Sequence, residues 1–141
     1  MENKFVWTEE YSVKNKMIDE QHQTFFAITN ELIAVAENAA AGKGAVLDEA
    51  TKLGDYAFYH LGTEEEMFKQ YDYPEAAEHI AAHNAFREKA KELIDGIRGG
   101  DPSDVRKLAE DAAEFSGKWL MNHIRVMDQR YSDFFTEKGL S

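Results

Sequence analysis

Five histidines recur along this chain at spacings that suit metal binding. They are His22, His60, His79, His83 and His123. His60 is followed four residues later by Glu64, and His79 is followed four residues later by His83. On an α-helix, residues four apart project from the same side. Imidazole nitrogens and carboxylate oxygens gathered on one helical face are ligands for transition metal ions.

An ordinary role in the core is the competing interpretation of these side chains. A single buried histidine is usually hydrogen-bonded to backbone or to a neighbour. Each unpaired buried polar group costs about 1–3 kcal/mol, so the whole set would consume much of a domain's stability of about 5–15 kcal/mol. A metal removes this conflict because it accepts imidazole lone pairs and neutralises carboxylate charge. The sequence therefore predicts a metal site.

The ligand set favours two metals over one. The zinc-protease motif H-E-x-x-H is absent because Ile80 follows His79. The Glu-x-x-His pair of ferritin-like bundles is also absent from the sequence. Five imidazoles would overfill a tetrahedral zinc site. Two metals need bridging carboxylates, so we expect a second acid beside Glu64.

Asp128 is the candidate for the second acid, five residues after His123. Five α-helical residues would rotate it by about 140° from His123, so its geometry is the weakest of the set. The alternatives are Asp19, Glu65 and Glu66. Asp19 is close to His22 in sequence, whereas the two glutamates are expected to turn toward water, without a role.

The elements that must position these side chains are predicted to be helices. Alanine, glutamate, lysine and leucine are frequent, and β-branched residues are sparse. Breaker-rich stretches at 39–45, 71–76 and 98–104 separate four helical segments, after an irregular arm to about residue 17. Short connections between long helices predict an all-α fold, an antiparallel up-down-up-down four-helix bundle. We expect one domain over 1–141, with the arm at about 1–17 and the bundle at about 18–136.

Each predicted helix carries an inward stripe with steps of three and four residues. The second stripe includes His60, Glu64 and Met67. The fourth stripe consists of Val105, Leu108, Ala112, Phe115, Trp119 and His123. The histidines lie alternately early and late in successive helices, so antiparallel neighbours bring all five to the same end of the bundle.

Composition limits the classes of partner. The chain has 141 residues, 43% of them hydrophobic and 30% charged, which is typical of a folded domain. Its net charge of −11 disfavours nucleic acid and anionic membrane surfaces. The first residues lack the apolar core of a signal peptide. The absence of cysteine excludes disulfides and thiolate chemistry and fits a reducing, cytoplasmic location.

Taken in order, these motifs resemble the hemerythrin family. They are His22, H-x-x-x-E at 60–64, H-x-x-x-H at 79–83 and H-x-x-x-x-D at 123–128. The surrounding stretches "DEQH" and "NHIRVMDQRY", and an arm that carries Trp7, match as well. The resemblance covers nearly the whole chain and looks most like the bacterial hemerythrins.

The resemblance implies a centre of two non-haem iron ions that binds dioxygen reversibly. Histidines matching His79, His83 and His123 would hold one iron, and those matching His22 and His60 the other. Acids matching Glu64 and Asp128 would bridge the ions, together with an oxo or hydroxo group. This leaves one open position on the iron held by two histidines. Dioxygen would bind there, and a small anion such as azide would bind there in the oxidised protein.

A dry pocket is also required, since water promotes loss of bound oxygen and leaves an oxidised centre. Trp119 and Leu120, which precede His123 by four and three residues, are predicted to shape this ligand pocket. Trp7 is expected to anchor the arm. Oxygen carriage, storage or delivery is the favoured function. The alternatives are an oxygen- or redox-sensing module and, less favoured, a di-iron oxidase or peroxidase or an iron store. Every histidine is used as a ligand, which leaves none as a general acid or base and favours a protein that is not an enzyme.

Overall fold

The computed structural model describes residues 4–38, 40–101 and 103–139, and every regular element in them is helical. The main helices are α1 (Lys16–Glu37), α2 (Lys43–Gln70), α3 (Ala76–Gly99) and α4 (Val105–His123). A π-helical segment, η2 (Ile124–Asp128), and α5 (Gln129–Glu137) follow α4 directly. A short 3-10 helix, η1 (Glu9–Tyr11), lies in the arm, whose residues 1–3 are outside the described part.

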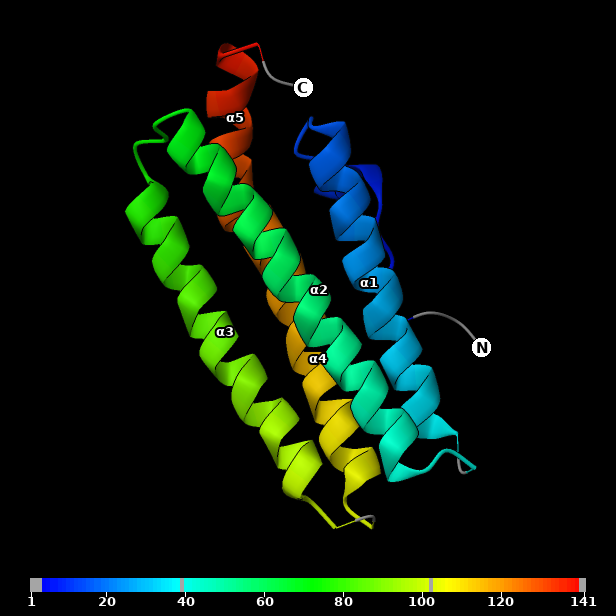
Figure 1. The fold of residues 1–141 in the computed structure, drawn as a ribbon. Coiled ribbons are helices and arrows are strands. Elements are labelled where there is room, and N and C mark those ends of the chain that lie inside the picture. The colour runs from blue at the N-terminus through cyan, green and yellow to red at the C-terminus, as the bar shows by residue number, and fades with distance from the viewer. Residues whose placement is uncertain (1–3, 39, 102, 140–141) are drawn as a thin grey trace.

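The four long helices form an antiparallel bundle, as predicted (Figure 1). α1 packs against α2 and α4, and α3 packs against the same two helices from the other side. The chain continues from α4 through η2 into α5 as one long rod. The ends of α2 and α4 that carry His60 and His123 therefore lie beside the starts of α1 and α3. None of the helices in these residues is both long and apolar enough to span a bilayer.

The arm is fixed to the bundle at Phe5. The Asn30 side chain accepts a hydrogen bond from the Phe5 N–H at 3.0 Å and donates one to the Phe5 carbonyl at 2.7 Å. The Phe5 ring lies on Gly117 of α4, where an added Cβ would collide with the ring. Glycine at this position therefore allows the arm to pack directly on α4.

The predicted inward face of α2 is observed from Val46 to Glu64, but the predicted face of α4 is slightly out of phase with the observed one. At the end of α2, Phe68 is buried and Met67 is only half-buried. In α4 the buried positions are Val105, Ala109, Ala112, Ala113, Ser116, Gly117, Leu120 and His123, whereas Leu108, Phe115 and Trp119 are half-buried. Small residues face the centre of the bundle because they let α4 approach closely, and the large side chains cover its flank. Phe115, for example, stacks on Phe86 of α3 with ring centroids 5.5 Å apart.

Candidate metal centre

The five histidines meet at one end of the bundle, together with Glu64 and Asp128. All seven side chains are buried. They form two groups that could each hold a metal ion: Glu64, His79, His83 and His123 in one, and His22, His60, Glu64 and Asp128 in the other. We call these the three-histidine group and the two-histidine group. In the first, the Nε2 atom of His123 lies 2.9 Å from that of His79 and 3.2 Å from that of His83.

The two carboxylates lie between the histidine groups. Glu64 Oε1 is 3.1 Å from His83 Nε2, and its other oxygen, Oε2, is 3.6 Å from His60 Nε2. Asp128 Oδ1 is 3.0 Å from His79 Nε2, and its Oδ2 is 3.2 Å from His22 Nε2. Each carboxylate therefore directs one oxygen toward each group, which is the geometry that a bridging ligand needs.

Asp128 reaches this position because the helix is locally π-helical. The segment Ile124–Asp128 has the i→i+5 pattern, so a residue five positions along returns to the same side. Asp128 Oδ1 consequently lies 3.1 Å from His123 Nε2. The rotation of about 140° expected for a regular α-helix does not occur. The other proposed acids lie elsewhere or bind other partners.

Asp19 is used to anchor the arm. Its carboxylate accepts a hydrogen bond from the Ser12 hydroxyl at 2.6 Å and another from the Val13 N–H at 2.9 Å. Glu66 is exposed, as expected.

Glu65 corrects the prediction from sequence, because it is half-buried and bonded rather than solvated. Its Oε2 lies 2.8 Å from His83 Nδ1 and 2.7 Å from Arg87 Nη1. The α2 face at Glu65 is turned toward α3, so the side chain meets His83 and Arg87 instead of water. Burial opposes ionisation of Glu65, but Arg87 and His83 outweigh it and lower the pKa of the carboxyl.

The ionisable side chains of the cluster shift one another's pKa values. Burial disfavours the charged form of His22, but the adjacent Asp128 and Glu64 carboxylates outweigh burial and raise its pKa to about 9. His60 lacks an equally close carboxylate, and burial lowers its pKa to about 4. Burial also opposes ionisation of Glu64 and Asp128, yet the surrounding histidines hold the pKa of both carboxyls below the usual range. The two buried carboxylates therefore favour positive charge beside them.

Comparison with known proteins agrees with this geometry. Residues 13–134 match the family described as "Hemerythrin HHE cation binding domain". The chain belongs to the hemerythrin family. It is 30% identical to a bacteriohemerythrin of Stenotrophomonas maltophilia over 91% of this chain and 79% of that protein. It is 27% identical to a hemerythrin-like protein of Naegleria gruberi over 90% of both chains.

The fold agrees with solved hemerythrin structures. A wild-type hemerythrin crystal structure superposes with a TM-score of 0.81 at 24% identity, covering 92% of this chain and 96% of that one. The crystal structure of a hemerythrin point mutant gives a TM-score of 0.82 at 23% identity, covering 94% of this chain and 97% of that one. The family resemblance and the bundle predicted from sequence are both confirmed.

Two further residues that contact the candidate ligands were missed from sequence. The Tyr131 hydroxyl donates a hydrogen bond to Glu64 Oε2 at 2.5 Å, and Gln21 Oε1 lies 2.7 Å from His60 Nδ1. Tyr131 is almost completely buried. A buried tyrosine hydroxyl usually finds a partner, so its position three residues after Asp128 was an available signal. Gln21 gave no signal beyond its place next to His22.

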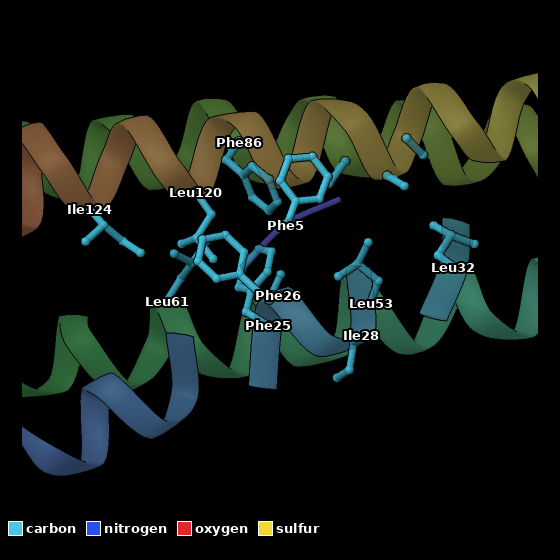
Figure 2. Packing of buried hydrophobic residues seen from close by; sticks show 14 of the residues in the cluster. Phe5, Phe25, Phe26, Ile28, Leu32, Leu53, Leu61, Phe86, Leu120 and Ile124 are labelled. Carbon is cyan, nitrogen blue, oxygen red and sulfur yellow. The ribbon is translucent and has the colours of Figure 1, made fainter. Parts of the chain in front are cut away.

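The two residues predicted to shape the ligand pocket differ in their surroundings. Leu120 is fully buried and points from α4 into the space between the helices, toward which Leu61 points from α2 (Figure 2). Trp119 stacks on His123 with ring centroids 4.3 Å apart and therefore lies against the three-histidine group. Phe25 approaches His60 edge-on at 6.2 Å. The pocket role of Leu120 and Trp119 stays a prediction.

Proposed function

We propose that this protein binds dioxygen reversibly at a centre of two non-haem iron ions and acts as an oxygen carrier, store or delivery protein. His79, His83 and His123 would hold one ion, and His22 and His60 the other. Glu64 and Asp128 would bridge them, with an oxo or hydroxo group between. The observation that carries the proposal is that each carboxylate directs one oxygen toward each histidine group.

The donor atoms fit such a pair of ions. Several buried atoms have no hydrogen-bond partner of good geometry among the described residues, including Nε2 of His22, Nε2 of His60 and both carboxylate oxygens of Asp128. Unpaired buried groups of this kind cost about 1–3 kcal/mol each, and a bound cation would satisfy several of them at once. The mixed nitrogen and oxygen set also suits manganese and zinc, so the ligands alone do not select the metal. The proposal of iron rests on membership of the hemerythrin family.

The buried apolar side chains next to the ligands in sequence support reversible binding. Two iron ions, when bound, would supply the electrons that hold dioxygen. Leu61, Leu120 and Ile124 are fully buried and would exclude water from the pocket. The Gln21 side chain would hold the ring of His60 in place through Nδ1. None of the five histidines is left over as a general acid or base, which favours binding over catalysis. We place this function in the cytoplasm.

Oxygen uptake by the reduced protein tests this proposal. We expect uptake in the presence of a mild reductant to stop near one oxygen per iron pair, and the oxygen to return when its pressure is lowered. Azide should bind the oxidised protein and compete for the same position. Metal analysis should give two irons per chain from cells supplied with iron. Sustained oxygen consumption well above slow autoxidation would indicate an oxidase instead.

A sensing role is the second candidate, and contacts of the arm favour it. The Ser132 hydroxyl donates to the Val13 carbonyl at 2.7 Å, and the Gln129 amide donates to the Ser12 carbonyl at 3.2 Å. Both donors lie within about one helical turn of Asp128, so a shift at the bridge could be passed to the arm. Amide hydrogen exchange of the arm, compared with and without oxygen, tests this candidate. Unchanged exchange would leave carriage as the better description.

A further inference from the structure

The two histidine groups differ in the side chain that contacts Nδ1, the ring nitrogen that faces away from the metal position. In the three-histidine group, His83 Nδ1 lies 2.8 Å from the carboxylate of Glu65. In the two-histidine group, His60 Nδ1 lies 2.7 Å from the amide oxygen of Gln21. One ring nitrogen therefore has a carboxylate as its partner, and the other has a neutral amide.

This difference changes the ligand strength of the two rings. Nδ1–H donation to either oxygen leaves the Nε2 lone pair directed at the metal position, so both partners fix the same tautomer. A carboxylate also makes the imidazole more basic, and loss of such an outer partner typically costs about 10–100-fold in metal affinity. An amide carries no charge and has a smaller effect on basicity. His83 is therefore the stronger donor of the two.

The position of Glu65 is fixed by a second contact. Arg87, one turn after His83 on α3, donates to the same Glu65 oxygen at 2.7 Å. The side chains of Glu65 and Arg87 are 23% and 24% exposed, so the pair lies at the edge of the core. Arg87 thus keeps the carboxylate against the outer side of the ring, away from the metal position.

We infer that Glu65 is a positioning residue that acts through His83 to make the three-histidine group the tighter of the two metal positions, so that this group fills first. The inference rests on the proposed function, because it assumes a pair of metal positions. In this inference Glu65, which is held in place by Arg87, makes the two metal affinities unequal. Gln21 contacts the ring of His60 in the weaker group.

Titration of the metal-free protein with Co²⁺ tests this order of filling. Co²⁺ suits the same ligands, and its visible absorption reports the coordination of each ion as it binds. We expect two binding steps for the unaltered protein. Glu65→Gln keeps the shape and the acceptor oxygen but removes the charge. It should weaken the first step by about 10–100-fold and leave the second nearly unchanged.

Matched variants separate this role from a general structural one. Glu66→Gln changes the adjacent, exposed glutamate and should leave both steps unchanged. Gln21→Glu places a carboxylate beside His60 and should strengthen the second step, so that the two affinities converge. Arg87→Gln should weaken the first step less than Glu65→Gln does. A structural role would lower the melting temperature of the metal-free protein and weaken both steps equally.

The outcomes distinguish this inference from the proposed function. If the unaltered protein binds two Co²⁺ ions and Glu65→Gln changes neither step, or both equally, the inference is wrong and the two-metal proposal stands. If the unaltered protein saturates at one ion, the two-metal proposal fails and the inference fails with it. Selective weakening of the first step by Glu65→Gln, together with strengthening of the second step by Gln21→Glu, supports both.

Discussion

The two halves of the bundle core differ in chemistry. Toward the α1–α2 and α3–α4 connections, the buried side chains are mostly apolar, and they include Leu32, Leu53, Ile97, Val105 and Ala109. Toward the α2–α3 turn, the same four helices bury five histidines and Glu64, and η2 adds Asp128. Phe25, Leu61 and Leu120 form an apolar layer (Figure 2). Phe25 lies next to the polar half, with its ring centroid 6.2 Å from that of His60, and we call these three residues the boundary layer.

This difference indicates that the two halves stabilise the fold in different ways. Apolar burial contributes about 25 cal/mol per Å² whether or not a ligand is present. Buried charges instead need a partner, and the binding energy of a metal adds directly to the free energy of folding. We expect the apolar half to set the stability of the metal-free protein and the polar half to add stability only when metal is bound.

The largest effect should come from Glu64→Ala. Glu64 is the acid that belongs to both groups, so under the proposed function its loss would leave the repulsion between two bound cations unscreened in a low-dielectric core. We expect the purified variant to lose most of its iron and the stability that comes with it. Metal analysis and thermal melting measure these changes. Glu66→Ala is the control, and an unchanged iron content in Glu64→Ala would show that Glu64 is not a bridge.

The apolar half is tested by Leu32→Ala. Leu32 is fully buried, so its truncation should lower the free energy of unfolding by about 2–5 kcal/mol. The loss should be the same with and without metal, and both irons should remain at saturation. Urea unfolding of both forms measures it. A loss that appears only in the iron-loaded form would mean that the two halves are not independent.

The boundary layer is tested by Leu120→Ala. We expect iron content to stay intact, because Leu120 supplies no ligand. The cavity should admit water near the two-histidine group and shorten the lifetime of the oxygenated protein. The decay of its visible absorption measures that lifetime, with Leu32→Ala as the matched control for a lost leucine. Equal lifetimes in the two variants would contradict a pocket role for Leu120.

A smaller effect is expected from Tyr131→Phe. The change removes the hydroxyl that donates to Glu64 Oε2 but keeps the buried ring. A hydrogen bond to a charged group contributes about 1.5–3 kcal/mol. We therefore expect the iron-loaded protein to unfold at lower urea concentration and to release iron faster to a chelator. If the chelation rate is unchanged, the hydroxyl does not help to hold Glu64 in place.

Much of this molecule could be predicted from its sequence, because the informative residues repeat at helical spacing. The bundle followed from four amphipathic segments, and the gathering of five histidines at one end followed from their alternating positions. The phase of α4 could not be predicted in the same way. Trp119 and Leu120 are adjacent and both apolar, and only the packing of α4 against its neighbours decides that Leu120 is the buried one.

The side chains that contact the candidate ligands from outside, such as Glu65, could not be predicted from the sequence either. Glu65 lies one position from the inward stripe, and on spacing alone it is equivalent to Glu66. It is bonded because α3 presents His83 and Arg87 to that face of α2, whereas Glu66 is turned to solvent. A contact between helices depends on their relative rotation, which hydrophobic periodicity gives only to within about one residue.

The π-helical segment Ile124–Asp128 also fixes the rotational register of everything that follows it. Tyr131 is eight residues after His123, which in a regular α-helix would separate their directions by about 80°. With one residue taken up in the wider turn, the two positions differ by only about 20°. In an alignment, the segment would therefore correspond to a one-residue insertion absorbed within a single turn. The residues on either side keep the faces that they would have in a shorter, uninterrupted helix.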